Sequence, residues 1–179
     1  GGYEVKLYDI ASDRVTLALG EIAASLARRA ARGLSSEAEA QAALQRITAV
    51  KTLAEAAEAD LIIEAASEEE AVKKGVFTEL TPLLGPDTLL ASNTSSISIT
   101  RLASVTDRPE RFIGLHFMNP APTMKLVELV RGIATSASTF ETAVAFAESL
   151  GKIITESEDF PAFIVNRILV PMMNEAVYV

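Results

Sequence analysis

The segment Asp60-Leu-Ile-Ile-Glu-Ala-Ala66 decides the fold class of this 179-residue chain. It is a largely apolar run that is too short for a helix, and such runs are typical of strands buried on both faces of a sheet. A helical pattern follows over residues 69–84, and a second short apolar run, Thr88-Leu-Leu-Ala-Ser92, comes after it. A strand, a helix and a second strand in this order predict a βαβ unit with parallel strands.

The same alternation extends in both directions along the chain. Further strands are predicted over residues 3–9, 47–50, 111–117, 126–130 and 152–155. Further helices are predicted over residues 12–33, 36–46, 99–104 and 139–150, as one turn from residue 52, and from residue 162 to the end. Ser12 is a predicted N-cap and Gly33 a predicted helix stop. The pattern predicts a doubly wound, mostly parallel α/β sheet.

Composition narrows the classes of partner. With 49% hydrophobic residues the chain can build the core of one domain and the start of a second. A net charge of −8 and a pI near 4.8 argue against nucleic acids and anionic membranes, because both need a concentrated basic face. No run approaches the roughly eighteen apolar residues that span a bilayer, and no secretory signal is recognisable. We predict a soluble, cytoplasmic chain.

The chain has no cysteine and one histidine. It can therefore form neither a disulfide nor a thiolate nucleophile, which fits a reducing compartment. A zinc ion would find only carboxylates as further ligands, so we predict no metal site.

The single histidine, His116, lies in Gly114-Leu-His-Phe-Met-Asn-Pro120, and Glu128 follows on the next apolar segment. Histidine suits proton transfer near neutral pH, and a buried carboxylate partner would fix its tautomer and raise its basicity. Two other readings of these residues stay open. His116 can be a hydrogen-bonded core residue, and Glu128 can be the exposed member of an edge strand.

Asp9 ends the first predicted strand. In a doubly wound dinucleotide-binding fold, an acidic residue at the end of the second strand binds the ribose hydroxyls, about 20 residues after the Gly-rich phosphate loop. If Asp9 holds this place, the glycine loop precedes residue 1. An acidic side chain repels a 2′-phosphate, so Asp9 favours NAD over NADP. An Asp that closes a strand is also an ordinary turn former, and this alternative stays open.

Six motifs occur together, in order along the chain: Val5-Lys-Leu-Tyr-Asp9, Ile63-Glu-Ala65 with Glu68, Ala91-Ser-Asn-Thr-Ser-Ser96, Gly114-Leu-His-Phe-Met-Asn-Pro120, Met124-Lys-Leu-Val-Glu128 and Phe163-Ile-Val-Asn-Arg167. Together they resemble the L-3-hydroxyacyl-CoA dehydrogenases, and within that family the bacterial 3-hydroxybutyryl-CoA branch. The resemblance implies a Rossmann-type domain and NAD-dependent oxidation of (S)-3-hydroxyacyl-CoA to 3-oxoacyl-CoA, as in β-oxidation of fatty acids.

The resemblance also implies the catalytic residues. His116 matches the general base that takes the proton of the substrate's 3-hydroxyl, and Glu128 matches its orienting partner. Ser95 matches the serine that hydrogen-bonds the reacting oxygen, although it can instead be the N-cap of the helix that follows. Asn166 matches a residue that donates a hydrogen bond near that oxygen or the thioester. It can instead lie on the solvated side of its helix, beside Arg167.

Residues of the cofactor and coenzyme A sites are implied in the same way. Those on the NAD side are Asp9, Glu68, Lys73, Asn93, Ser95 and Asn119. Those on the acyl-CoA side are Ser25, Arg32, Ser95 and Asn166. Glu68 and Lys73 can also be ordinary surface charges at a helix start, and Asn119 can simply shape the turn before Pro120. A cation at Arg32 would suit the phosphates of coenzyme A.

The resemblance further predicts two domains. Residues 1–158 form an NAD-binding domain that lacks its first strand, and residues 159–179 begin an all-helical domain that closes the substrate cleft and forms a homodimer. We expect the fragment alone neither to bind NAD tightly nor to turn over. Two alternatives are a dehydrogenase of a free hydroxy acid such as gulonate and a non-catalytic structural protein such as a lens crystallin. A structural protein would need only well-packed side chains at positions 95, 116, 128 and 166, so the presence of Ser95, His116, Glu128 and Asn166 together argues against that alternative.

Overall fold

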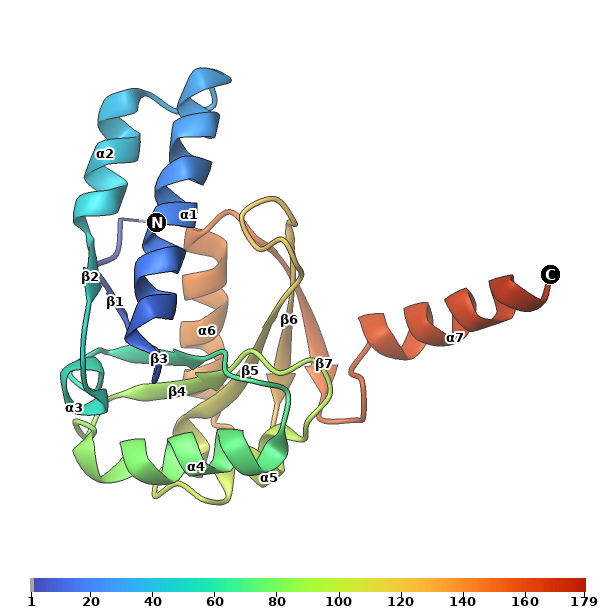
Figure 1. Ribbon diagram of the computed structural model, residues 1–179. Coiled ribbons are helices and arrows are strands. Elements are labelled where there is room, and N and C mark those ends of the chain that lie inside the picture. The colour runs from blue at the N-terminus through green and yellow to red at the C-terminus, as the bar shows by residue number, and fades with distance from the viewer. Residues whose placement is uncertain (1) are drawn as a thin grey trace. The chain divides into compact units, whose positions relative to one another are not determined.

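The predicted alternation of strands and helices runs through the computed structural model, which describes residues 2–179 (Figure 1). The chain divides into two units, the first ending at Ala59 and the second beginning at Asp60. Each unit is described by itself.

The first unit holds two parallel strands and three helices. Strand β1 (Val5–Leu7) pairs with β2 (Ile47–Ala49), so that Val5 lies opposite Ile47. Between them come α1 (Ser12–Ala31) and α2 (Glu37–Gln45), and α3 (Leu53–Ala56) follows β2. Two helices between parallel strands make a long crossover, which parallel pairing requires.

Local capping explains most helix ends of this unit. Ser36 and Glu39 form a capping box at the start of α2, and the Thr52 hydroxyl accepts from the backbone at the start of α3. Gly33, with φ of 69°, ends the α1 region as predicted. The predicted N-cap was wrong, because Ser12 lies inside α1. The N-cap position is Ala11, whose N–H donates to Asp9 Oδ1 at 2.9 Å.

The second unit is built on a five-stranded sheet. Its strands, in spatial order, are β3 (Leu61–Glu64), β4 (Leu89–Ser92), β5 (Phe112–Phe117), β6 (Leu126–Arg131) and β7 (Ile153–Glu158). The first three are parallel to one another and β6 is parallel to β7, whereas β5 and β6 are antiparallel. The connection over residues 118–125 explains this exception, since a parallel crossover needs roughly a dozen residues.

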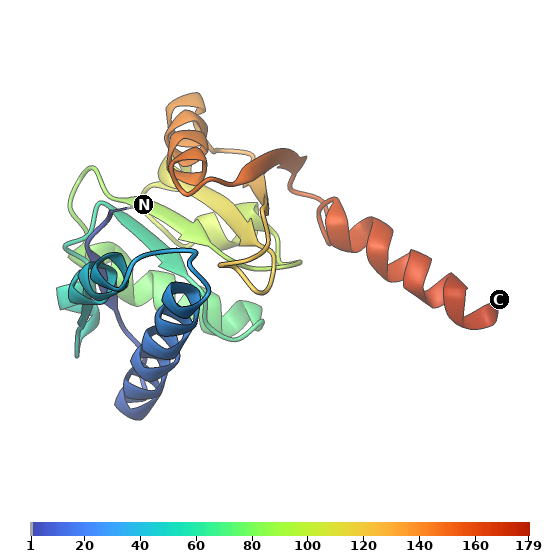
Figure 2. The same cartoon turned by 90° about the horizontal axis from the view of Figure 1, so that it is seen from above.

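Helices cover both faces of this sheet (Figures 1 and 2). One face carries α4 (Glu70–Leu80), continued by the 3-10 helix η1 (Thr81–Leu83), and α5 (Ile99–Ala103). The other face carries α6 (Ala137–Ser149), and a further 3-10 helix, η2 (Pro109–Arg111), leads into β5. This arrangement confirms the predicted doubly wound α/β fold.

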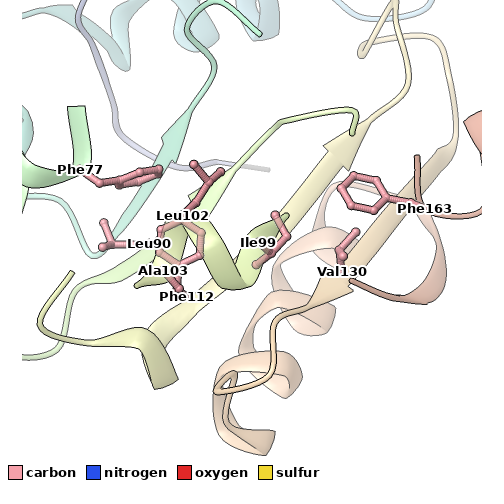
Figure 3. Close-up of a cluster of buried hydrophobic side chains, with 8 residues drawn as sticks. All are labelled: Phe77, Leu90, Ile99, Leu102, Ala103, Phe112, Val130 and Phe163. Atoms are coloured by element: carbon pink, nitrogen blue, oxygen red, sulfur yellow. The ribbon is translucent and has the colours of Figure 1, made fainter. Parts of the chain in front are cut away.

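Two apolar clusters form the cores of the two faces. Figure 3 shows the first, whose members are Phe77, Leu90, Ile99, Leu102, Ala103, Phe112, Val130 and Phe163. In it the rings of Phe77 and Phe112 meet edge to face, with centroids 4.7 Å apart. The second comprises Ala91, Ile113, Leu115, Val127, Leu129 and Ala143. Consecutive residues of β4, β5 and β6 thus point to opposite faces of the sheet, as they do in any pleated strand.

Two predictions for this unit were wrong in detail. The segment at β3 is not buried on both faces, since β3 pairs only with β4 in this sheet and Ile63 is 37% exposed. The last helix, α7 (Val165–Tyr178), begins three residues later than predicted, because Ala162 and Phe163 have φ of 66° and 50° and cannot continue a right-handed helix.

Most large apolar side chains of α7 are exposed, and no residue of α7 is buried. None of the helices within residues 2–179 is both long enough and apolar enough to cross a bilayer. In the same part of the chain, no three His, Asp or Glu side chains gather where they could hold a metal ion.

Candidate active site

His116 and Glu128 face each other across the antiparallel pair β5–β6. The register places His116 directly opposite Glu128, which brings their side chains to the same face. His116 Nδ1 lies 2.7 Å from Glu128 Oε2, and the residues are 6% and 0% exposed. Glu128 is therefore not the exposed member of an edge strand, because β6 lies between β5 and β7.

The second oxygen of Glu128 binds the start of α7. Oε1 accepts hydrogen bonds from the backbone N–H groups of Ile164, at 2.9 Å, and Val165, at 2.8 Å. These N–H groups have no partner within the helix, and a helix N-terminus favours a negative charge. The carboxylate is thus bound on both oxygens, which fixes its orientation toward the imidazole.

Phe163 lies against the same imidazole. Its ring centroid is 5.8 Å from that of His116, in an edge-to-face arrangement. Phe163 and Ala162 are the two non-glycine residues with positive φ among residues 2–179. Such backbone strain is retained where the surrounding contacts impose it. Here the contacts are those of Phe163 with the core and of the following N–H groups with Glu128.

Ser95 lies in the segment between β4 and α5. Its N–H donates to Glu68 Oε1 at 2.8 Å, and Asn166 Nδ2 donates to its carbonyl oxygen at 3.3 Å. Ser95 is not the N-cap of α5, since the Ser98 hydroxyl accepts from Arg101 N in that role. Within residues 2–179 no hydrogen bond engages the Ser95 hydroxyl, which leaves it open to a ligand.

Asp159, which the sequence analysis did not single out, ties the β7–α7 connection to this segment. Its two oxygens accept three hydrogen bonds at the start of α5, from the Ser98 hydroxyl and two backbone N–H groups, each at 2.8 Å. Asp159, before α7, and Asn166, within α7, therefore each bind the segment between β4 and α5 or its end. In the sequence, the only indication of a role for Asp159 is that it is an acidic residue two places before Pro161, ahead of a predicted helix.

Glu68 gathers donors from the same segment. Its Oε1 accepts from the Thr94 hydroxyl at 2.6 Å and from Ser95 N and Ser96 N. Partial burial raises the pKa of the Glu68 carboxyl, but the hydrogen bonds from Thr94 and Ser95 and the charge of Lys73 outweigh it. This pKa therefore lies below its usual value. Glu68 is not an unpartnered surface charge.

We expect the stabilisation from Glu68 to disappear in acid. The pKa of a glutamate in an unfolded chain is about 4.3. When folding lowers this pKa, the charged carboxylate stabilises the fold at pH values above the unfolded-state pKa. The stabilisation is lost as the pH falls through the folded-state pKa. Glu68→Gln should therefore unfold at lower urea than the wild type at neutral pH and converge with it below about pH 4. Glu148→Gln, on the exposed side of α6, should follow the wild type throughout. A gap for Glu68→Gln that stays constant with pH would contradict the expectation.

The other residues predicted on the cofactor side lie as follows. Lys73 is buried, and its Nζ lies 2.8 Å from Glu64 Oε1. Asn93 Oδ1 accepts from Phe117 N at 2.9 Å, so Asn93 joins the carboxyl ends of β4 and β5. Asn119 is exposed in the β5–β6 connection.

Three predicted site residues lie in the first unit. Asp9 is half-buried after β1, Ser25 is half-buried within α1, and Arg32 is exposed at the C-cap of that helix. Ser25 thus belongs to α1, and Arg32 lies at the C-terminal end of that helix. Their ligand roles stay predictions.

Comparisons with known proteins identify the family of this chain. Residues 1–160 match the family described as 3-hydroxyacyl-CoA dehydrogenase, NAD binding domain. A 3-hydroxybutyryl-CoA dehydrogenase of Bradyrhizobium diazoefficiens is 54% identical over 177 residues, which are 99% of this chain and 60% of that protein. A probable 3-hydroxybutyryl-CoA dehydrogenase of Bacillus subtilis is 47% identical over 99% of this chain and 62% of its own length.

Solved structures show the same likeness. The crystal structure of (S)-3-hydroxybutyryl-CoA dehydrogenase from Ralstonia eutropha superposes with a TM-score of 0.95 at 42% identity, over 98% of this chain and 62% of that one. The chain thus spans about three fifths of the length of these relatives. With a family match over nearly its whole length and a buried histidine–glutamate pair, the chain belongs to the 3-hydroxyacyl-CoA dehydrogenases, through their NAD-binding domain.

Proposed function

We propose that the whole protein carrying this chain oxidises (S)-3-hydroxyacyl-CoA, with 3-hydroxybutyryl-CoA as the first candidate, to 3-oxoacyl-CoA with NAD. The observation that carries the proposal is the buried pair of His116 and Glu128, 2.7 Å apart. Relatives named 3-hydroxybutyryl-CoA dehydrogenase support the substrate class.

The pair is arranged for proton transfer from an alcohol. Because Nδ1 of His116 is engaged by Glu128, the Nε2 atom is the free nitrogen that takes the proton of the substrate's 3-hydroxyl. As the ring becomes imidazolium, the Glu128 carboxylate offsets its charge. The Ser95 hydroxyl hydrogen-bonds the substrate oxygen as it changes from alcohol to ketone. Asn166, bound to the Ser95 carbonyl, lies beside the same oxygen or the thioester.

The residues present suit a dinucleotide. In open α/β sheets ligands bind beyond the carboxyl ends of the parallel strands, and Glu68, Lys73 and Asn93 follow those ends in the second unit. In the first unit, Asp9 follows β1, where an acidic side chain binds ribose hydroxyls and repels a 2′-phosphate. Bound NAD would supply the acceptor for the hydride.

We further propose that residues 1–158 act as the NAD-binding domain and residues 159–179 begin a helical domain that closes the substrate cleft and forms a homodimer. Ser25 and Arg32 are assigned to coenzyme A, and Asn119 to the cofactor side. A fatty acid oxidation complex subunit alpha of Psychrobacter arcticus, 41% identical over 170 residues, supports a place in β-oxidation. A cytoplasmic location is part of the same proposal.

The proposal is tested by following NADH absorbance as the whole protein reduces acetoacetyl-CoA. We expect rapid loss of absorbance with the thioester, little with free acetoacetate or a gulonate-type acid, and little with NADPH in place of NADH. Absorbance loss with the free acids alone would establish the hydroxy-acid alternative. No loss with any substrate would leave the structural alternative.

A further inference from the structure

Glu64, at the carboxyl end of β3, belongs to a buried ion pair that the proposed mechanism does not use. The side chains of Glu64 and Lys73 are 2% and 1% exposed, and their charged atoms are 2.8 Å apart. Glu64 Oε1 also accepts from Ala66 N at 2.5 Å, and Oε2 accepts from the Ser92 hydroxyl at 2.6 Å. Burying two charges is costly, and it is tolerated when further hydrogen bonds satisfy the charged groups, as those from Ala66 N and the Ser92 hydroxyl do for Glu64.

The lysine of this pair also has a second carboxylate nearby. Lys73 Nζ donates to Ala66 O at 3.1 Å and lies 3.6 Å from Glu68 Oε2, a longer separation than its 2.8 Å contact with Glu64. Lys73 is thus held mainly by Glu64. Glu68 remains free to turn its other oxygen toward the donors of residues 94–96.

We propose that Glu64 is a positioning residue for Ser95. By holding Lys73, it keeps the ammonium from drawing in the Glu68 carboxylate, and Glu68 then fixes the Ser95 backbone. The attraction between buried charges is strong, because little water screens it. A Lys73 without its Glu64 partner would close the 3.6 Å gap to Glu68 and pull that carboxylate off the 94–96 segment. The catalytic part of this inference rests on the proposed function, whereas the structural part does not.

The test replaces Glu64 with glutamine in the whole protein, which keeps the shape and removes the charge; the amide oxygen takes the place of Oε1, and the Ser92 hydroxyl can turn to accept from the new NH₂ group. Amide hydrogen exchange at residues 95 and 96 reads out the segment directly. We expect exchange there to become about tenfold faster, a change within the usual coupling between neighbouring residues. Unchanged exchange at these two residues would overturn the proposal.

A rescue experiment separates positioning from general loss of stability. Adding Lys73→Met to Glu64→Gln removes the competing cation, so protection at residues 95 and 96 should return toward the wild-type value. A purely structural role predicts no return. Where Glu64→Gln fails to fold, Glu64→Asp replaces it, since the shorter side chain lengthens the contact with Lys73 while keeping the charge. Wild-type exchange at residues 95 and 96 in Glu64→Asp would likewise refute the role.

Activity provides the second readout. Glu64→Gln should lower kcat about tenfold in the wild-type background but cost little in a Ser95→Ala background, because residues that act through one another are not additive. Full additivity would show that Glu64 does not act through Ser95. If the wild type itself does not reduce acetoacetyl-CoA, the proposed function fails, and the exchange experiment still decides the role of Glu64.

A matched control lies on α4, the helix that also carries Lys73. Glu70 makes ion pairs with Lys74 and Arg101, each at 2.8 Å, near the surface. Glu70→Gln removes the same charge without touching Lys73, so exchange at residues 95 and 96 and kcat should stay at wild-type values.

Discussion

Replacing Glu128 with glutamine is expected to lower kcat of the whole protein by on the order of a hundred- to ten-thousand-fold, the usual contribution of general acid–base catalysis. The variant should still fold, because glutamine has nearly the same shape as glutamate. The loss follows from the two-sided binding of this side chain. Oε2 meets His116 Nδ1, and Oε1 accepts from Ile164 N and Val165 N.

The start of α7 decides how the new amide is oriented. Two backbone N–H groups require an acceptor, so the glutamine oxygen takes the place of Oε1, and its NH₂ group faces His116. Nδ1 must then accept a hydrogen bond, which moves the ring proton to Nε2. A protonated Nε2 cannot take the proton of an alcohol. The imidazole would remain in place but in the wrong tautomer.

Steady-state oxidation of (S)-3-hydroxybutyryl-CoA with NAD, the direction in which His116 takes the proton, and a thermal melt of the same samples measure this effect. The matched control is Glu156→Gln, since Glu156 pairs with Arg131 at 3.3 Å near the surface of β7. The control should keep wild-type kcat. A Glu128→Gln enzyme with wild-type kcat would show that the carboxylate does not set the tautomer.

The largest expected loss of stability comes from Gly114→Ala. A Cβ at this position would lie 2.8 Å from Val130 Cβ and 2.9 Å from Ile99 Cδ1, and Figure 3 shows both of those side chains within the core. Val130 is β-branched and has little rotamer freedom, so the strands must shift. Overpacking of this kind costs about 1–3 kcal/mol. Because β5 also carries His116, activity should fall as well.

Urea unfolding of the whole protein measures this cost, and Gly75→Ala is the control. Gly75 lies within α4, and a Cβ there would meet nothing within 4 Å beyond its chain neighbours and the adjacent backbone of its own helix. Alanine is favoured over glycine inside a helix by up to about 1 kcal/mol, so this variant should unfold at higher urea than the wild type. Equal midpoints for Gly114→Ala and the wild type would contradict the predicted clash.

Features that depend on near neighbours could be predicted from the sequence. The stop predicted at Gly33 and the helical turn predicted from Thr52 are present, because each involves residues within one turn of a helix. The N-cap predicted at Ser12 is the exception, since the N-cap position is Ala11. The pairing of His116 with Glu128 was implied by the family resemblance, whereas the residues alone left other readings open; the register of β5 and β6 places the two opposite each other.

Long-range contacts could not be predicted in the same way. The partners of Asp159 lie about sixty residues earlier, and the Ser92–Glu64 bond joins two strands separated by a helix. The predicted start of the last helix failed for the same reason. Its first N–H groups are placed by Glu128, 36 and 37 residues away, and Ala162 and Phe163 take up the strain.

The sequence by itself determined the order of strands and helices, because hydrophobic period and capping residues are local properties. The residues of the proposed site were implied by the family resemblance. The tertiary structure alone decided how the carboxylates are shared. Glu128 binds both an imidazole and the start of a helix, and Lys73 lies 2.8 Å from Glu64 but 3.6 Å from Glu68. These assignments depend on distances between separate elements, and such distances exist only once the sheet has brought those elements together.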